Sequence, residues 1–551
     1  MSKQNQGLHK RLLVLAVAGA IGAAGMATAA VPAGGGFATL TQATRLGRGD
    51  VVQNAMPATR SLNITVVLKL RNETQLQAFN SRPHAPMSHA QLSADYLPMA
   101  ADAQAVADYL KQAGFSNVRI SANRMLINAR GSAAAVQSAF RTSLVSVHTH
   151  DGRSAFANST AIQIPAALQG RVQAVLGLQT VHKAHVLARA IPNDTVGVQG
   201  HNPLDFASIY DASGLPAASN IDTGIIGWGS MAQTLVDLGT FTSQNSLPSV
   251  NTEVVCIDYG GYNNGTISTT DPNCKNFDQG TTEWDIDSQD IVAMSGGVKS
   301  LTFYAAYGGY NTSITNAINE VVTPTAGEPM AQVVNMSFGE CERYEDSGQG
   351  GDGSAQANDA LFQLGAAHGQ TFSASTGDSG SNECGDGQLD SASYPASSPW
   401  VVAVSGTTLR ASSTTWSREN VWLDAGGSPS SFEKAQPWQT ALTYGTYKGS
   451  RGPDIAFDAN PSSGALVIVN GQVSQWGGTS LASPIFVGAW ARILHGNAGL
   501  GFAAPHLYAL PASDLHDVRS GNNGQYIAKP GWDWTTGLGS FDVGKAAAAL
   551  K

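Results

Sequence analysis

Ser480 is the residue of this chain best suited to act as a nucleophile. It lies in Gly-Thr-Ser-Leu-Ala-Ser-Pro (residues 478–484), just before an apolar stretch that predicts a helix over residues 481–494. A seryl hydroxyl is a poor nucleophile until a neighbouring base takes its proton. At a helix start, backbone donors and the helix dipole favour a developing oxyanion, and Pro484 would fit the first turn. The alternative is an N-capping serine on a buried helix.

Two carboxylates far upstream are the candidates for that base. Glu283 and Asp287 lie in Glu-Trp-Asp-Ile-Asp-Ser-Gln (residues 283–289), where a helix is predicted to begin. Side chains four residues apart share one helix face, and adjacent carboxyls can split their pKa values so that only one is ionised. Glu283 could then accept the proton of Ser480 while Asp287 supports Glu283. The alternative is an acidic helix N-terminus that complements the dipole.

Asp378 follows a short apolar strand predicted over residues 372–374, within Ser-Thr-Gly-Asp-Ser-Gly. In α/β folds, loops beyond the carboxyl ends of strands carry functional residues. When protonated in acid, Asp378 could donate a hydrogen bond to the oxygen of a tetrahedral intermediate. An Asx-turn is the alternative interpretation.

The histidine of a Ser-His-Asp triad is not evident. Asp222-Thr223-Gly224 is similar to the aspartate segment of such enzymes. The histidines of the same part of the chain stand in unrelated contexts, at His201, His368, His495, His506 and His516. We therefore interpret Asp222 as a strand-end or turn residue.

Taken together, these segments resemble the sedolisin family of serine-carboxyl peptidases. The three segments occur in the family's order, and Val-Asn-Met-Ser-Phe-Gly (334–339) and Pro-Asp-Ile-Ala-Phe-Asp (453–458) extend the resemblance over about residues 200–545. The form of the Glu-Trp-Asp segment looks closest to the bacterial, pepstatin-insensitive endopeptidases rather than to the tripeptidyl branch. The resemblance implies Ser480 as nucleophile, Glu283 as its base, Asp287 as support for that base, and Asp378 at the oxyanion.

The same resemblance implies one structural calcium ion near the C-terminus. Calcium binds six or more oxygens from carboxylates and backbone carbonyls. Where the family commonly has a second glycine, this chain has Lys529, which still offers a carbonyl. Without the resemblance, a Gly-rich turn would be the ordinary interpretation. The implied ligands, two carboxylates and two carbonyls, are Asp517, Asp533, Val518 and Gly531.

The chain divides into four predicted parts. Basic residues, an apolar run over residues 12–24 and a small-x-small site at Ala27-Thr28-Ala29 predict a secretory signal over residues 1–29, with a membrane anchor as the alternative. We expect a secreted protein, extracellular or periplasmic. The remaining parts are an activation propeptide (30–189), a linker and processing region (190–203) and a catalytic domain with the calcium site (204–551).

The propeptide is predicted to be a ferredoxin-like α+β domain. Its β-α-β-β-α-β order combines strands and helices over residues 64–70, 101–112, 118–120, 125–129, 133–140 and 144–148. Beyond it, short apolar strands alternate with helices. This alternation predicts an α/β fold with a mostly parallel sheet covered by helices on both faces, and the resemblance implies that it is subtilisin-like.

Charge and cysteines add two expectations. Residues 1–200 hold 18 Lys and Arg against 7 Asp and Glu, whereas residues 201–551 hold 13 against 33. A basic propeptide could therefore dock on the acidic catalytic part at neutral pH and be released in acid, and nucleic acid would be repelled by that acidic part. Export permits disulfides, and sequence order favours Cys256–Cys274 and Cys341–Cys384 among the three possible pairings.

The sequence thus predicts a secreted acid endopeptidase, made as a self-processed zymogen that its own propeptide inhibits. A carboxylate base keeps an ionised fraction at about pH 3–5, where a histidine of pKa ~6.5 is protonated. We expect protein or peptide substrates, a monomer, and no membrane contact after signal removal. The rival interpretations are a neutral subtilase that uses Asp222 and a cryptic histidine, and a catalytically silent binding protein on the same scaffold.

Overall fold

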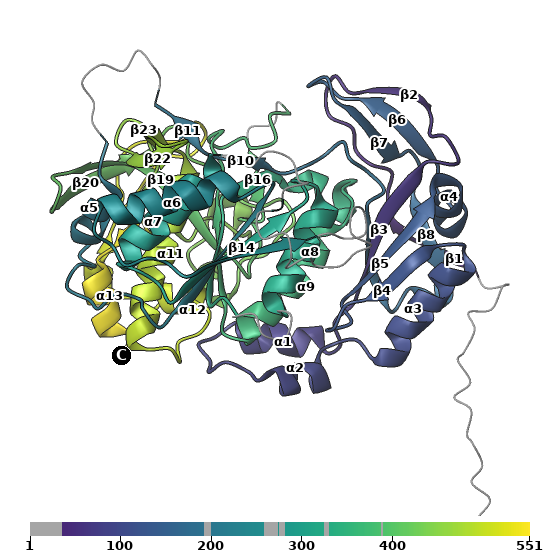
Figure 1. Ribbon diagram of the computed structural model, residues 1–551, viewed down its shortest axis with the longest axis horizontal. Helices are drawn as coiled ribbons and strands as arrows, with labels where there is room; N and C mark the ends of the chain where they lie inside the picture. Colours follow the sequence, from purple (N-terminus) through teal and green to yellow (C-terminus); the bar gives the residue numbers. More distant parts are fainter. Residues whose placement is uncertain (1–35, 192–199, 258–273, 275–281, 324–329, 387–389) are drawn as a thin grey trace, which may run out of the picture.

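A small N-terminal domain lies beside a larger C-terminal domain in the computed structural model (Figure 1). The structure describes residues 36–191, 200–257, 274, 282–323, 330–386 and 390–551. The expected signal and most of the expected linker lie outside the described residues, and the four-part division of the chain stays a prediction. Among the helices of the described ranges, none combines the length and apolar character that a membrane span needs.

The N-terminal domain contains the predicted ferredoxin-like sheet, with one strand different. Helix α3 (Ala100–Gln112) connects the first two strands in the chain, and α4 (Ala133–Phe140) follows the third. The expected fourth strand, residues 144–148, forms but belongs to a separate sheet with β2 (Val51–Ala55) and β7 (Ser154–Asn158). Its place is taken by β9, so the order across the sheet is β4 (Ser116–Ile120), β5 (Leu126–Ser132), β3 (Ser61–Leu68) and β9 (Val172–Leu176).

The C-terminal domain is built on one eight-stranded sheet, parallel except at β20. This confirms the predicted α/β class, because buried apolar strands alternate with helices along the chain. Strand β21 (Ile455–Asp458) pairs with β19, and the other strands lie in the order β13 (Thr252–Ile257), β14 (Ser300–Ala306), β12 (Asp222–Trp228), β15 (Val333–Met336), β17 (Thr371–Ser375), β19 (Val402–Ala411) and β20 (Trp416–Val421).

Two helices that lie together on this sheet bring distant parts of the sequence into contact. Helix α7 (Glu283–Ser295) packs along α11 (Thr479–Gly496). Gly488 allows this, since a Cβ there would lie 2.7 Å from the Cβ of Met294 and 3.0 Å from the carbonyl oxygen of Ile291. Helices α8 (Asn311–Val322) and α9 (Ser354–Ala367) pack together and contact β14 and β17, respectively.

The N-terminal domain packs against α8 and α9 (Figure 1). One cluster of buried apolar side chains runs through both domains and includes Leu76 and Leu126 from the smaller one. Carboxamides add specific contacts, as in the bond from Asn123 Nδ2 to Asn319 Oδ1 (2.8 Å) and from Asn128 Nδ2 to Asn316 Oδ1 (2.8 Å). Apolar burial and these amide pairs therefore dock the domain, alongside any attraction between opposite charges.

After this domain, the chain crosses the upper surface of the C-terminal domain (Figure 1). Strand β10 (His185–Val186) pairs antiparallel with β16 (Phe338–Cys341), and β11 (Arg189–Ala190) pairs antiparallel with β23 (Gln472–Gly477). The two expected disulfides, Cys256–Cys274 and Cys341–Cys384, are both formed. Cys341 is the last residue of β16.

Candidate active site

Ser480 is fully buried in the first turn of α11. Gly478, the residue before the helix, has a φ of +100°, a conformation that side chains other than glycine rarely adopt. A Cβ at this glycine would also lie 2.0 Å from the carbonyl oxygen of Leu187, so the crossing segment lies against the backbone beside Ser480. First-turn amides of a helix have no acceptor within the helix, which leaves them available to an external oxygen.

The helix begins two residues earlier than predicted, at Thr479, so Pro484 lies inside it and not in its first turn. A proline has no N–H, and it therefore leaves the carbonyl four residues earlier, that of Ser480, without its helical donor. The hydroxyl oxygen of Ser337 lies 3.4 Å from this carbonyl oxygen. The Ser480 hydroxyl in turn lies 3.5 Å from the carbonyl oxygen of Ser337, so the two serines are neighbours.

Glu283, the first residue of α7, brings a buried carboxylate to this point. Its Oε2 accepts hydrogen bonds from the backbone N–H of Leu187 (3.1 Å) and of Ala188 (2.8 Å). Burial and the nearby Asp287 raise the pKa of Glu283 well above its ordinary value, while a hydrogen bond with Ser480 and the amide of Ala188 oppose the rise. The candidate base thus contacts both the candidate nucleophile and a peptide bond.

Asp287, one turn further along α7, lies behind Glu283 and is fully buried. Its Oδ1 accepts a hydrogen bond from Ser337 Oγ (2.6 Å), which itself accepts one from Asn335 Nδ2 (2.8 Å). Burial raises its pKa well above the ordinary value, against the lowering effect of Ser337 and Asn335. Ser337 was not among the predicted site residues, although it lies in the segment 334–339. Its position directly after the apolar strand β15 is the signal that could have identified it.

Asp378 lies beyond the end of β17, as expected, and only 3 % of its surface is exposed. Its Oδ1 accepts from both the backbone N–H (2.8 Å) and the hydroxyl (2.8 Å) of Thr479, the residue before Ser480. Its Oδ2 lies 3.4 Å from Nε of Arg189. Burial raises the pKa of Asp378 to about 7, although Thr479 and Arg189 lower it. The structure therefore brings all four predicted catalytic side chains together.

Asp222 lies at the opposite end of the sheet. It is the first residue of β12, and its carboxylate accepts from Lys299 Nζ (2.8 Å) and Ser300 Oγ (2.6 Å). Parallel strands end at one common edge, so the start of β12 is far from the edge that carries Asp378. The interpretation of Asp222 as a strand-end residue is confirmed.

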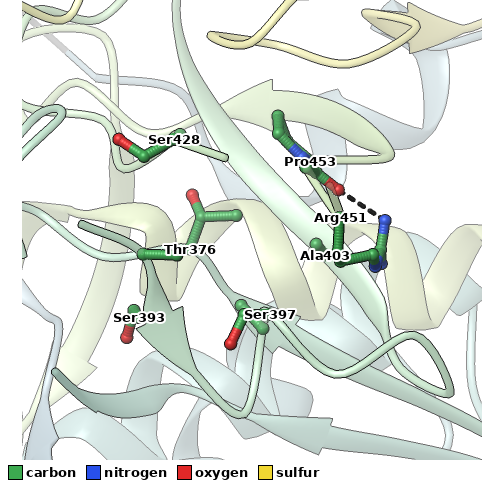
Figure 2. Close-up of a pocket in the computed structure, with 11 residues that line it drawn as sticks. Thr376, Ser393, Ser397, Ala403, Ser428, Arg451 and Pro453 are labelled. Atoms are coloured by element: carbon green, nitrogen blue, oxygen red, sulfur yellow. Dashed lines mark hydrogen bonds between the residues drawn. The ribbon is translucent and has the colours of Figure 1, made fainter. Parts of the chain in front are cut away.

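A small cavity of about 20 Å³ lies beside Thr376, the residue that follows β17 and precedes Asp378 by two positions. Figure 2 shows the hydroxyls of Thr376, Ser393, Ser397 and Ser428 on one side of it, with Arg451 and Pro453 opposite. The charge of Arg451 is balanced by a buried ion pair with Asp454 (2.6 Å). The cavity has room for about one water molecule and is polar enough to hold it.

The expected calcium ligands lie on neighbouring loops near the C-terminus. Asp517 Oδ2 accepts from the backbone N–H of Gly531 (3.0 Å), and Asp533 Oδ2 accepts from that of Lys529 (3.0 Å). The Nζ of Lys529 lies 2.9 Å from the ring centre of Tyr444. Within the described ranges, no group of three or more His, Cys, Asp or Glu side chains could hold a metal. The expected site differs from such a group because it has two carboxylates and backbone carbonyls.

Many carboxyls of the C-terminal domain are buried, and burial raises the pKa of each of those named here. It raises the pKa of Asp285 and of Glu340 to about 8, and that of Asp458 to about 7. Asp290 of α7 is fully buried, and within the described part of the chain neither of its oxygens has a hydrogen-bond partner. The other members are Glu283, Asp287, Glu342, Glu345, Asp359, Asp378, Glu383 and Glu433.

The chain is similar to known proteins over most of its length. The activation domain of pro-kumamolisin matches residues 49–181, and the subtilase family matches residues 260–507. Sedolisin of Pseudomonas sp. (strain 101) is 42% identical over 90% of this chain and 88% of its own length. Xanthomonalisin of Xanthomonas sp. (strain T-22) is 40% identical over 89% of this chain, which spans 66% of that protein.

A solved structure agrees with these matches. Pseudomonas sedolisin, described as a serine-carboxyl proteinase and complexed with pseudo-iodotyrostatin, is 44% identical with a TM-score of 0.58. The similarity covers 64% of this chain and 98% of that structure. Together with the sequence relatives, it confirms the subtilisin-like fold.

The buried carboxyls predict that the protein is more stable in mild acid than at neutral pH. A carboxyl whose pKa is raised by folding contributes its stability below the unfolded value of about 4 and loses it as the pH rises through the folded value. In a Ser480→Ala chain, which lacks the candidate nucleophile, the unfolding midpoint should be higher at pH 5 than at pH 8. Asp290→Asn should raise the midpoint at pH 8 by a few degrees and change it little at pH 5. An equal loss at both pH values would contradict this account.

Proposed function

Because this chain belongs to the sedolisin family of serine-carboxyl peptidases, we propose that it is an acid endopeptidase that first cuts its own propeptide and then other proteins. The N-terminal domain is its activation domain and the C-terminal domain is a serine-type peptidase domain. One observation carries the proposal. Glu283 contacts both the hydroxyl of Ser480 and the amide nitrogen of a peptide bond that lies across the site.

In the proposed mechanism, Ser480 attacks the substrate carbonyl while Glu283 takes its proton. Glu283 must be ionised for this, although its surroundings oppose ionisation. A proton on Asp287 removes the negative charge that opposes Glu283 most after burial itself, so one proton held by the pair is best placed on Asp287. Glu283 then returns its proton to the leaving nitrogen, and water hydrolyses the acyl-enzyme on Ser480.

Asp378 acts at the developing oxyanion. Because Thr479 donates twice to Oδ1, a proton on the carboxyl is better placed on Oδ2. A pKa of about 7 means that this proton is present in acid and is lost as the pH rises through neutrality. The donor is therefore available at acidic pH only, which supports an acidic range for the reaction.

Replacement of the nucleophile and its base tests this function. Ser480→Ala should abolish both propeptide cleavage and peptide hydrolysis at pH 4. Glu283→Gln, which keeps the shape but cannot accept a proton, should lower kcat by about 10²–10⁴. Maturation of purified Ser480→Ala chain without another protease, or full activity of Glu283→Gln above pH 7, would contradict the proposal.

Asp378→Asn tests whether titration of the oxyanion donor causes the loss of activity at neutral pH. Its side-chain amide donates at any pH, so the mature variant should keep activity at pH 7–8, where the wild type loses it. Asp378→Ala, the matched control without a donor, should lose about 10²–10³ in kcat at acidic pH, where the wild-type carboxyl is a donor, and should gain no activity at pH 7–8. An unchanged alkaline limb of the pH profile in Asp378→Asn would assign that limb to another group.

We further propose that the protein is exported and works as a monomer, either outside the cell or in the periplasm. The predicted signal over residues 1–29 supports export. The two disulfides are also of the kind that forms and persists in oxidising compartments.

We propose in addition that one calcium ion stabilises the C-terminal loops. The donors there are hard oxygens of the type calcium prefers, and hydrogen bonds already hold the loop of Asp517 against Gly531. Carboxylates of Asp517 and Asp533 would bind the ion together with carbonyls of Val518 and Gly531. The lysine at position 529 is compatible with this calcium site because its side chain lies over the ring of Tyr444.

Removal of calcium tests this site. A chelator should lower the unfolding midpoint of the Ser480→Ala chain by several degrees, and added calcium but not magnesium should restore it. Asp533→Asn should abolish the difference between the two conditions. A midpoint that does not respond to the chelator would contradict the calcium proposal and leave the catalytic one intact.

A further inference from the structure

The segment that joins the two domains lies in the active site as a substrate would, and we infer that Leu187–Ala188 is the first peptide bond that this protein cuts. The inference rests on the proposed function, because it needs Ser480 as the nucleophile.

Two strand pairings fix the segment on both sides of Ser480. In β10, Val186 lies opposite Phe338, the residue after Ser337. In β11, Arg189 lies opposite Gly477, three residues before Ser480. The chain is thus held upstream and downstream of the nucleophile, and only the three peptide bonds between Val186 and Arg189 lie in the gap.

Only one of these three bonds makes the contacts with the proposed catalytic groups that cleavage needs. The nitrogen that leaves must take a proton from the base, and Ala188 N lies 2.8 Å from Glu283 Oε2. The oxygen of the attacked carbonyl must meet the oxyanion donor. A Cβ built on Gly478 would lie 2.0 Å from the oxygen of Leu187 and 2.8 Å from Asp378 Oδ2, so both oxygens lie against that glycine. The two ends of one amide bond therefore face the two groups that would act on them.

The neighbouring bond meets only half of this requirement. The nitrogen of Leu187 lies 3.1 Å from Glu283 Oε2, which is also within hydrogen-bond distance. The carbonyl of that bond belongs to Val186, however, which is held in strand β10. The bond after Ala188 leads into Arg189, which is held in strand β11.

The reaction balances with water as the only co-reactant. Ser480 Oγ forms an ester bond with the carbonyl carbon of Leu187 and gives its proton to Glu283. The C–N bond breaks, and the same proton passes to the nitrogen of Ala188, which becomes a free amine. Water then hydrolyses the ester, so Leu187 ends as a carboxylate and Ser480 regains its proton.

The same register indicates the class of substrate. The side chain before the cut bond, that of Leu187, is apolar and only 4 % exposed. Two residues after the bond, the guanidinium of Arg189 contacts Asp378, reaches Asp424 Oδ2 at 3.6 Å and lies 5.9 Å from the ring centre of Trp422. Substrates with an apolar residue before the bond and a basic residue second after it should therefore be favoured.

The direct test identifies the first product of the intact chain. Purified zymogen is acidified to pH 4 in ¹⁸O-labelled water and quenched at low conversion, and the fragments are weighed and sequenced. We expect a fragment ending at Leu187 that carries the label, a partner beginning at Ala188, and a rate independent of protein concentration. A first fragment that begins at any other residue would overturn the inference. Because Ser480→Ala would still block cleavage in that case, the proposed function would stand; only maturation of Ser480→Ala would remove both.

Variants at Ala188 provide a matched comparison. Ala188→Pro removes the N–H and replaces the leaving nitrogen by a tertiary amide, so the first cut should slow by about 100-fold or more. Ala188→Gly keeps the N–H and should be cut at the same bond. Cleavage of Ala188→Pro at the wild-type rate would overturn the inference.

A synthetic peptide makes the test independent of zymogen folding. The mature enzyme should cut a peptide of residues 182–191 between the leucine and the second alanine. An analogue with glutamine in place of the arginine should lose about two- to fivefold in kcat/KM, as suits a partly exposed ion pair. Cleavage at another bond would overturn the assigned register, and equal rates for the two peptides would overturn the assigned preference for a basic residue.

Discussion

The site depends on carboxyl groups that are buried in a low-dielectric interior, where burial raises their pKa values. Helix α7 carries four such groups, Glu283, Asp285, Asp287 and Asp290, and every residue of the helix is buried. A histidine base would need none of this. In the proposed mechanism, a carboxylate base works beside a second carboxyl that holds a proton, and burial favours that proton by raising the pKa of Asp287 well above its ordinary value.

The same physical effect links activation to pH. In the intact chain the positive charge of Arg189 lies beside Asp378 and lowers the pKa of that carboxyl. Acid adds a proton to Asp378, which the proposed oxyanion donor needs, and weakens the ion pair of this carboxyl with Arg189. Under the proposed function, the segment that fills the site at neutral pH would become its substrate when the pH falls. Inhibition and the proposed self-cleavage would then be two states of one set of contacts.

The candidate catalytic side chains could be predicted from sequence because three of them stand at a recognisable boundary and the fourth, Asp287, lies one helical turn after Glu283. Glu283 begins a helix, Asp378 follows a short apolar strand, and Ser480 precedes an apolar helix. It is harder to predict which strands pair with one another. Residues 144–148 form the expected strand, but the alternation of a short strand does not indicate which sheet the strand joins. The role of Ser337 depends on contacts with two distant helices, since its hydroxyl donates to Asp287 of α7 and lies 3.4 Å from the Ser480 carbonyl oxygen of α11. The Leu187–Ala188 register likewise depends on two strand pairings between distant segments.

The central claim is that the native fold holds carboxyl protons at a pH where free carboxyls have lost them. It can be measured as the protons released when the Ser480→Ala chain is unfolded by urea at pH 7.5 in weak buffer. Histidine is largely neutral at this pH in either state, so carboxyls dominate the signal. The account predicts a net release of protons, smaller in Asp290→Asn. No release, or a net uptake, would contradict it.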